Sequence, residues 1–510
     1  MTVVLDGSQL TLEQVERVAR GREAVDIAPE AWDRIRKCRA FLDEKVAARA
    51  VMYGVTTGIG ELSEVVLTPE ETERFQRYLV YSHAAGYGEP IAEADVRAAI
   101  LSRLNVHCHG LSGLRPVVDE TLLAMLNRGV TPVVCQRGSV GASGDLSPMG
   151  QIALVVMGEG EAFYEGERMP GAQAMERAGI PSVTLEARDG LAIINGSNVV
   201  AGMGALQLLD AWRWLKTSEV AGAMSLEVLN AQMAAFDERL HKARGYAGAV
   251  ASAASIRRIT EGSEMLYSDV LGKKKVQDAY SLRSTPQVIG SARDAWRYAR
   301  EQFEIELNGV GDNPLFFSED EEVVTGANFQ GTPLAFALEL LGIAVTTVSV
   351  LSERRTNRLM NRHLSMGLPA FLTRGAGMMS GMMLAQYTAG SLVAENRVLA
   401  HPAATGSIAA AADQEDFVSM AMTTAIKTRQ ILDNACGVLA VELLAGAQAL
   451  DFRKPHLPGK GTQAAYELVR EQVAFMEEDR PLYDDINRLA GLVRSGRFAQ
   501  VVEEAVGSLD

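Results

Sequence analysis

The sequence predicts a mainly α-helical protein whose second half is an elongated helical bundle. Three observations favour this fold. The strong helix formers Ala, Leu, Glu, Met and Arg dominate the second half of the 510-residue chain. Aromatic residues make up only 6% of the sequence, and β-branched residues show little clustering, so few strands are expected. Apolar residues also recur at helical spacing over long stretches.

Two segments carry apolar stripes typical of amphipathic helices. The stripe in residues 94–105 consists of Val96, Ile100, Leu101 and Leu104, and that in residues 287–307 of Val288, Ala292, Ala295, Trp296, Ala299, Phe303 and Leu307. Members of each stripe recur every three or four positions, as residues on one helix face do. We therefore expect each helix to bury one face and expose the other.

Longer helical patterns dominate the rest of the chain. They cover residues 200–236, 333–362, 381–400, 417–450 and 463–478, with breaks at Gly309–Pro314 and Pro455–Gly461. Long helices with short breaks are typical of a bundle. Because Gly-bearing loops are more frequent before residue 200, the sequence predicts a loop-rich part, residues 1–200, and a long-helix part, residues 201–510.

Composition limits the class of protein. A hydrophobic content of 47% is enough for a large core, and a net charge of −15 without a basic stripe disfavours a nucleic-acid partner. The four cysteines form no Cys-x-x-Cys pair, which predicts reduced thiols. The amino terminus does not resemble a secretory signal, so we expect a cytoplasmic location. The apolar stretch Leu334–Leu351 contains Glu339, and we expect a buried bundle helix there and no membrane span.

The segment Gly138–Pro148 has the most distinctive chemistry, because Ala142, Ser143 and Gly144 lie between glycines and ahead of Asp145. Glycine adopts backbone conformations closed to other residues, so the Gly144 nitrogen can reach the Ala142 carbonyl carbon and close a five-membered ring. Loss of water from Ser143 would then give 4-methylideneimidazol-5-one (MIO). This electron-poor alkene is an electrophile, which no unmodified side chain supplies. A simple glycine-rich loop is the alternative from these residues alone.

Further motifs accompany the tripeptide along the chain. They are Tyr53–Gly60, Ser82–Gly86, Leu191–Gly196, Gln277–Arg283, Asp312–Phe316, Asn328–Phe329 and Gln414–Met420. Together they resemble the signature of the aromatic amino acid ammonia-lyase and aminomutase family, roughly from residue 53 to the end. The resemblance implies a helical bundle of the fumarase/ammonia-lyase type whose amino-terminal part carries MIO. It also implies a homotetramer in which residues of different subunits share each active site.

The resemblance assigns a role to two reactive side chains. Tyr53 matches the base that removes the β-hydrogen of an α-amino acid substrate. A phenol normally ionises near pH ~10, so Tyr53 needs neighbours that favour the phenolate. Arg283 matches the arginine that binds the substrate carboxylate through two parallel hydrogen bonds.

Other residues match the surroundings of the ring and of the substrate. Asn195 and Tyr280 match residues that hold and polarise MIO, and Gln277, Asn313 and Phe329 match residues that line the pocket. Asp145 is placed either to assist ring formation or to serve as a helix N-cap.

Ser82, His83 and Glu415 bear on the substrate side chain. By resemblance, Ser-His is typical of histidine enzymes and of some tyrosine aminomutases, whereas phenylalanine enzymes have Phe-Leu and tyrosine lyases His-Leu. Glu415 favours histidine, because histidine enzymes have Gln-Glu-Asp where the others have Gln-Asp. A carboxylate accepts the imidazole N–H, which a benzene ring lacks. We expect conversion of L-histidine to trans-urocanate and ammonia.

Alternatives remain open. Gln330 and Phe417 stand where histidine enzymes tend to have histidine, and the segment Tyr466–Phe498 resembles tyrosine aminomutases. A tyrosine or phenylalanine ammonia-lyase, or a tyrosine 2,3-aminomutase, is therefore the second hypothesis. A non-catalytic helical scaffold is a third, which the intact tripeptide, Tyr53 and Arg283 disfavour.

Metal-dependent, nucleotide-dependent and serine-nucleophile enzymes fit the sequence less well. The cluster His107–His109 has no second ligand pair, and Gly459–Thr462 lacks the upstream glycine of a phosphate loop. Ser143 does not lie in a nucleophile elbow, because Asp145 takes the place of the second glycine.

Overall fold

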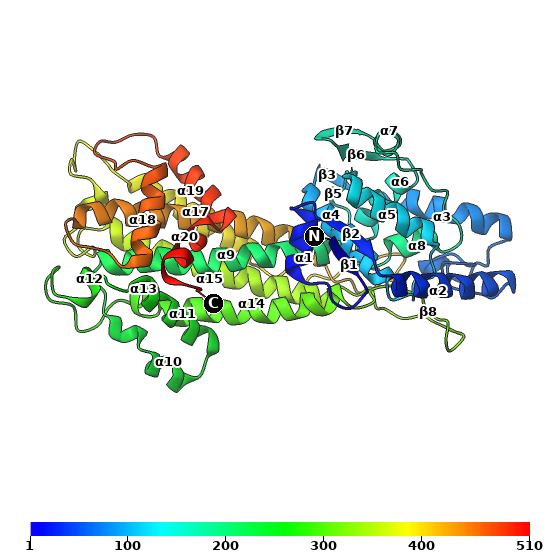
Figure 1. The fold of residues 1–510 in the computed structure, drawn as a ribbon, viewed down its shortest axis with the longest axis horizontal. Coiled ribbons are helices and arrows are strands. Elements are labelled where there is room, and N and C mark those ends of the chain that lie inside the picture. The colour runs from blue at the N-terminus through cyan, green and yellow to red at the C-terminus, as the bar shows by residue number, and fades with distance from the viewer. Residues whose placement is uncertain (1, 510) are drawn as a thin grey trace. The chain divides into compact units, whose positions relative to one another are not determined.

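The computed structural model describes residues 2–509, and it is mainly helical (Figure 1). The described chain divides into two compact units. The first contains residues 2–207, Ala299–Glu339 and Pro402–Ile426, and the second contains Leu208–Tyr298, Leu340–His401 and 427–509. The predicted mainly helical fold is confirmed. The predicted division into a loop-rich part, residues 1–200, and a long-helix part, residues 201–510, stays a prediction.

The first unit combines short helices with short strands. Its helices are α1 (Leu12–Ala19), α2 (Pro29–Ala47), α3 (Pro69–His83), α4 (Glu93–His107), α5 (Pro116–Arg128), α6 (Leu146–Val156), α7 (Gly171–Arg177) and α8 (Asp189–Ile194). Its strands are β1 (Thr2–Leu5), β2 (Ala24–Ile27), β3 (Tyr87–Pro90), β4 (Thr131–Pro132), β5 (Cys135–Arg137), β6 (Glu161–Tyr164), β7 (Glu167–Pro170), β8 (Leu315–Phe317) and β9 (Glu322–Val324). β1 and β2 pair in parallel, whereas β3–β5, β4–β6–β7 and β8–β9 pair antiparallel.

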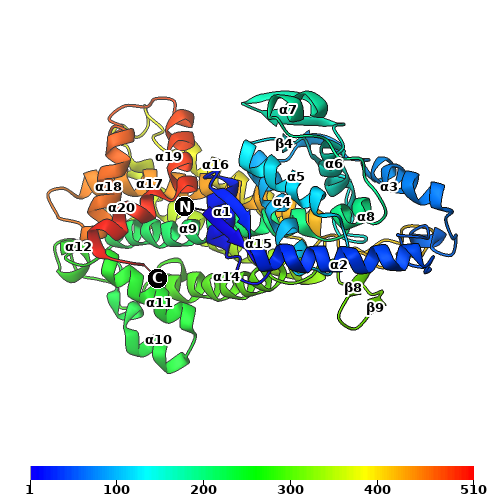
Figure 2. The same ribbon diagram turned by 45° about the vertical axis from the view of Figure 1, so that its right-hand side comes forward.

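The second unit has only helices among its named elements. Helices wholly within it are α10 (Glu238–Arg244), α11 (Ala247–Ile259), α12 (Glu264–Tyr267), α13 (Tyr280–Arg283), α16 (Met383–Leu399), α18 (Lys460–Gln472), α19 (Tyr483–Ser495) and α20 (Arg497–Val506). The carboxyl-terminal helices α18, α19 and α20 pack against one another, as Figure 2 also shows.

Four long helices contain residues of both units. They are α9 (Asn198–Val228), α14 (Thr285–Leu307), α15 (Thr332–Met360) and α17 (Ala421–Arg453). All four correspond to helices that the apolar pattern predicts, with ends displaced by at most eight residues, the largest difference being at the end of α9. Most of the predicted stripe of α14 is confirmed, because Ala292, Trp296, Ala299, Phe303 and Leu307 are buried, whereas Val288 and Ala295 are half-buried.

Helix α4 is present but is not amphipathic. Every residue from Asp95 to His107 is buried, including Arg97 and Arg103, whereas the apolar stripe predicted one exposed face. The helix packs against α1, α5 and β4, so its polar face is covered as well. Its buried charges must therefore be hydrogen-bonded within the protein.

Two helices are long and apolar enough to cross a membrane by length and composition. In α15, 67% of the apolar window is buried inside the protein, and in α17 the figure is 83%. Such burial is typical of bundle-core helices. The sequence analysis considered only the first of them, α15, as a possible membrane span, because polar residues interrupt the apolar pattern of α17.

Candidate active site

The site begins where three helices of the first unit meet. Helices α3, α6 and α8 pack against one another in pairs. His83 ends α3, Asp145 precedes α6, and Asn195 follows α8. A side chain at Gly150 of α6 would lie only 3.2 Å from the Ala84 nitrogen, so this glycine allows α6 to approach the end of α3. The packing brings three separate motifs together.

The tripeptide forms a tight turn between Gly141 and Gly144. The φ angle of Ser143 is 52° and that of Gly144 is 86°, so two successive residues adopt the left-handed conformation. A Cβ atom on Gly144 would lie 2.2 Å from the backbone carbon of Gly196. Only glycine fits at position 144, because its backbone passes directly against that of residue 196.

Gly196 holds this turn through both of its backbone groups. Its N–H donates to the Ser143 carbonyl oxygen at 3.1 Å, and its carbonyl oxygen accepts from the Asp145 N–H at 2.8 Å. The preceding residue, Asn195, is 2% exposed, and its Oδ1 atom has no hydrogen-bond partner among the described residues. A buried amide oxygen without a donor is costly, which is the state expected of an acceptor that awaits a ligand.

Asp145 occupies the N-cap position of α6 but does not cap that helix with its side chain. Its Oδ2 atom instead accepts the N–H of Val200, in the first turn of α9, at 2.8 Å. Burial raises the pKa of this carboxyl group to about 7, although the hydrogen bonds from Val200 and Val199 act in the opposite direction. The N-cap interpretation is therefore wrong for α6, and Asp145 ties the tripeptide to α9.

Glu415 reaches the tripeptide from a distant part of the sequence. Its Oε1 atom accepts a hydrogen bond from the Ser143 hydroxyl group at 2.9 Å. Glu415 pairs with Ala410 across a turn in which Ala411, Ala412 and Asp413 have φ angles of 48°, 52° and 67°. Left-handed conformations cost non-glycine residues about 1–2 kcal/mol each. The loop thus holds a strained turn that presents a half-buried carboxylate to Ser143.

His83 adopts one tautomer in its neutral form. Its Nδ1 atom lies 2.7 Å from the Leu79 carbonyl oxygen, which can only accept, so Nδ1 carries the hydrogen and Nε2 is left as an acceptor. Burial lowers the pKa of His83 below its ordinary value, and the Leu79 hydrogen bond and the nearby charge of Glu415 offset this only in part. Ser82 is exposed, and its hydroxyl group also donates to Leu79.

Tyr53 lies in the same neighbourhood with its hydroxyl oxygen accepting the Gly60 N–H at 3.1 Å. Burial raises the pKa of Tyr53, the Gly60 hydrogen bond lowers it, and the Glu415 charge raises it again. The resultant pKa lies above the ordinary value for tyrosine. The Gly60 hydrogen bond favours the phenolate, as expected of a base, but burial and the Glu415 charge outweigh it. The neutral phenol is therefore favoured.

Asn313 and Phe329 belong to the first unit as well. Asn313 is 7% exposed, and its Oδ1 accepts the Gly326 N–H at 2.7 Å. Phe329 is half-buried, and its carbonyl oxygen accepts from Ser197 at 3.0 Å, next to the Asn195–Gly196 peptide.

Gln277, Tyr280 and Arg283 lie together in the second unit, on α13 and the loop before it. Gln277 is exposed, and the Tyr280 side chain is 72% exposed. The guanidinium carbon of Arg283 lies 4.5 Å from the centre of the Tyr280 ring, and its Nε donates to the Asp278 carbonyl oxygen. Its two Nη atoms have no partner among residues 2–509, so a free guanidinium fork is available to an anion.

The sequence interpretation missed three buried charged residues behind the tripeptide: Arg103, Arg188 and Asp312. All three side chains are fully buried, and both arginines form ion pairs with Asp312. The available signal was an arginine among the apolar residues of helix α4, since a charge inside a buried helix needs specific partners.

His107 belongs to this buried network. His107 Nδ1 lies 2.6 Å from Asp119 Oδ1, and Nε2 lies 2.8 Å from Arg103 Nε. Within residues 2–509, no group of three or more His, Cys, Asp or Glu side chains is arranged to hold a metal ion.

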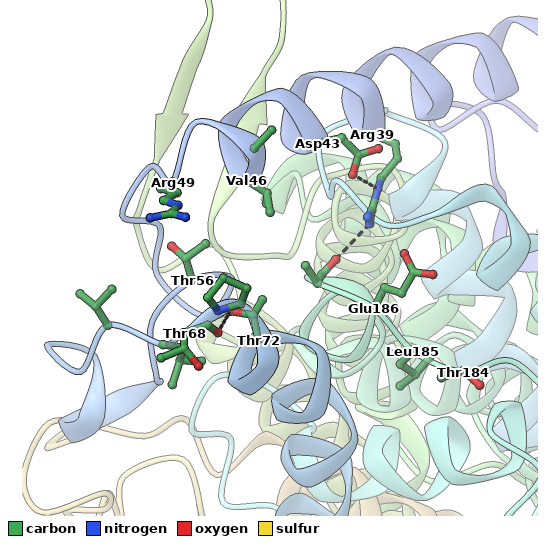
Figure 3. Close-up of a pocket in the computed structure, with 15 residues that line it drawn as sticks. Arg39, Asp43, Val46, Arg49, Thr56, Thr68, Thr72, Thr184, Leu185 and Glu186 are labelled. Carbon is green, nitrogen blue, oxygen red and sulfur yellow. Dashed lines mark hydrogen bonds and ion pairs between the residues drawn. The ribbon is translucent and has the colours of Figure 1, made fainter.

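A separate cavity of about 1020 Å³ opens in the first unit (Figure 3). Arg39 and Asp43 point toward each other on one side, and Thr56 and Thr72 lie on another. None of the predicted catalytic residues lines it. Thr56 connects it to the Tyr53 turn, because its hydroxyl group donates to Ala50 and accepts from the Met52 N–H.

The mainly helical fold and the Ala142–Gly144 site together indicate a lyase of the ammonia-lyase type, and comparisons with known proteins agree. The model of the family described as aromatic amino acid lyase matches residues 10–471. A histidine ammonia-lyase of Alkaliphilus oremlandii is 46% identical, with 99% of each chain covered.

Among solved structures, a tyrosine aminomutase from Streptomyces globisporus superposes with a TM-score of 0.95 at 37% identity, covering 99% of both chains. A histidine ammonia-lyase from Trypanosoma cruzi superposes with a TM-score of 0.92 at 34% identity, covering 99% of this chain and 96% of the other. The chain belongs to the aromatic amino acid lyase family, and it is a carbon–nitrogen lyase.

Proposed function

We propose that the protein eliminates ammonia from L-histidine to give trans-urocanate. The observation that carries this proposal is the 2.9 Å hydrogen bond between Ser143 and Glu415. It puts the carboxylate that suits an imidazole N–H directly at the reactive tripeptide. Full-length relatives named histidine ammonia-lyase at 45–46% identity support the same substrate.

We also propose that Ala142, Ser143 and Gly144 form MIO, and the residues around them fit this group. The tripeptide adopts a left-handed turn, the Gly196 N–H donates to the Ser143 carbonyl oxygen, and the Asn195 Oδ1 atom has no donor among the described residues. Asn195 and Gly196 would hold the ring, with Tyr280 as a further contact. When formed, MIO supplies an electrophile that makes the amino group of an amino acid a better leaving group.

The remaining roles follow from the chemistry of each side chain. Tyr53, once ionised, takes the β-hydrogen, and Glu415 accepts the imidazole N–H of the substrate. His83 offers Nε2 as a second acceptor beside Ser82. The free Nη atoms of Arg283 suit the substrate carboxylate.

Further side chains line the substrate pocket in this proposal. Gln277, Asn313 and Phe329 are assigned to its wall. The exposed Tyr280 side chain and the free Arg283 fork support a homotetramer in which residues of different subunits share one site. A cytoplasmic location is supported by four unpaired cysteines, three of which are buried.

A tyrosine 2,3-aminomutase is the second candidate. Tyrosine aminomutase structures superpose at 37% identity, and the apolar Phe417 side chain, 59% exposed, lies two residues from Glu415. A tyrosine or phenylalanine ammonia-lyase belongs to the same alternative.

The deciding experiment incubates the protein separately with L-histidine, L-tyrosine and L-phenylalanine, without added metal or nucleotide. Ultraviolet absorbance follows the conjugated acrylate, and chromatography identifies the products. Urocanate and ammonia from histidine alone are expected. Coumarate or a β-amino acid from tyrosine, without urocanate from histidine, would refute the proposal in favour of the second candidate.

A further inference from the structure

Arg103 lies at the centre of a buried hydrogen-bond network behind the tripeptide. Its side chain is fully buried on α4, and its guanidinium group touches four segments of the first unit. Nε donates to the Ala192 carbonyl oxygen at 2.7 Å, and Nη1 donates to those of Asn195 and Gly311 at 2.7 and 2.9 Å. Nη2 pairs with Asp312 Oδ2 at 2.8 Å. Few single side chains could bridge these groups, because the guanidinium is a planar set of five donors.

The contact with Asn195 leads directly to the reactive turn. The Asn195 carbonyl and the Gly196 N–H are the two ends of one planar peptide unit. Arg103 binds the carbonyl end, and the N–H end donates to the Ser143 carbonyl oxygen at 3.1 Å. If the carbonyl is fixed, rotation of this peptide is blocked, and the N–H stays directed at Ser143. Arg103 therefore controls a donor to the tripeptide without touching the tripeptide.

Arg103 is itself held from two sides. The second oxygen of Asp312 pairs with Arg188 at 2.8 Å, and Arg188 also donates to the Ser112 and Asn313 carbonyl oxygens. On the other side, His107 Nε2 lies 2.8 Å from Arg103 Nε, while His107 Nδ1 is engaged with Asp119. A guanidinium group fixed in this way keeps its geometry without help from solvent.

We propose that Arg103 is a positioning residue for ring formation: it fixes the Asn195–Gly196 peptide so that the tripeptide is held in its left-handed turn. This inference rests on the proposed MIO chemistry. In that step the Gly144 nitrogen bonds to the Ala142 carbonyl carbon, and the Ala142 oxygen leaves as water with the Gly144 and Ser143 amide hydrogens. The Ser143 hydroxyl leaves with the α-hydrogen as a second water. No oxidant is required.

The same helix provides a matched control. Arg97 is 1% exposed and donates to the carbonyl oxygens of Val18, Ala19 and Leu126, none of which belongs to the tripeptide or its accompanying motifs. A lysine at either position keeps the charge but loses the planar fork. Arg97→Lys thus reproduces the burial and the loss of carbonyl contacts but leaves the Asn195–Gly196 peptide untouched.

The test measures ring content without any substrate. Mass spectrometry of the peptide that contains residues 142–144 reports the loss of two water molecules. We expect complete loss in the native protein and in Arg97→Lys, and a mainly unmodified peptide in Arg103→Lys. Turnover per ring should also fall in Arg103→Lys, by about a hundredfold in kcat with little change in KM, as expected of a small misplacement. Full ring content with native kcat in Arg103→Lys would overturn the inference, as would equal loss in both variants.

A second variant covers the case in which Arg103→Lys does not fold. Asp312→Asn has the same shape and keeps an acceptor, but it removes the charge that holds Arg103. It should yield soluble protein with a partly unmodified peptide, and a fully modified peptide with native kcat would refute the inference. Native protein that carries the ring but leaves histidine unchanged would refute the proposed substrate alone. Native protein without the loss of two waters would refute both the MIO proposal and this inference.

Discussion

Replacing Glu415 with glutamine tests the basis of substrate choice. The Glu415 carboxylate lies 2.9 Å from the Ser143 hydroxyl group, so it borders the position where the substrate amino acid must bind. Glu415→Gln keeps the length of the side chain and one acceptor oxygen but removes the negative charge. It also adds N–H donors, which an imidazole N–H cannot use.

The magnitude follows from the kind of hydrogen bond that is lost. A hydrogen bond to a charged group contributes about 1.5–3 kcal/mol, against about 1 kcal/mol for a neutral pair. Because glutamine keeps a neutral acceptor, the loss is the difference, about 0.5–2 kcal/mol. Every 1.4 kcal/mol corresponds to about tenfold, so kcat/KM for histidine should fall by about two- to thirtyfold. Tyrosine or phenylalanine turnover, where it can be detected, should fall far less, because their rings have no N–H for the carboxylate.

The assay compares kcat/KM for histidine with that for tyrosine in native protein and in Glu415→Gln. Asp413→Asn is a suitable control, since it removes a negative charge from the same loop at a residue with φ of 67°, which asparagine tolerates. It should leave histidine turnover within about twofold. An equal loss for both substrates in Glu415→Gln, or an equal loss in Asp413→Asn, would remove Glu415 from the specificity argument.

Three further predictions concern the ring, the base and a buried acid. Ser143→Ala should fold normally, as judged by its thermal unfolding midpoint, yet lose urocanate formation by orders of magnitude; native activity in this variant would refute the MIO proposal. Because the Glu415 charge raises the pKa of Tyr53, the rise of kcat/KM with pH that reflects ionisation of Tyr53 should move to lower pH in Glu415→Gln. A shift to higher pH would contradict the role of Tyr53 as base. Burial raises the pKa of Glu227 from 4.5 to about 8, so its contribution to stability should be lost as pH rises through this range. Glu227→Gln keeps an acceptor for the Gly459 N–H but cannot ionise, so its unfolding temperature should exceed that of native protein most above pH 8. A difference in unfolding temperature between the two proteins that does not vary from pH 4.5 to 8 would contradict this explanation.

The helices could be predicted because their pattern depends on local spacing. In α14 the stripe from Ala292 to Leu307 matches the buried face, and α15 and α17 begin and end within a few residues of the expected bounds. The tripeptide was equally visible, since its chemistry depends on three consecutive residues. Features of this kind need no knowledge of what packs against them.

The network around Arg103 could not be predicted, because it depends on contacts between distant segments. Arg103 is 89 residues from Ala192 and 209 from Asp312 along the chain. Its helix shows an apolar stripe on one side, but the other face is also covered, and spacing alone cannot reveal that. The contact between Ser143 and Glu415 spans 272 residues, and only the family motifs suggested that these residues belong to one site.

The charge of Glu415 links substrate recognition to the base. It raises the pKa of Tyr53, which opposes formation of the phenolate, and it raises that of His83, which favours the imidazolium. A substrate N–H that donates to Glu415 offsets part of this negative charge, so its effect on Tyr53 weakens when histidine is bound. A substrate with a benzene ring has no N–H to donate and leaves the full effect in place. In the proposed mechanism, the same contact that selects an imidazole ring therefore also makes the β-hydrogen easier to remove.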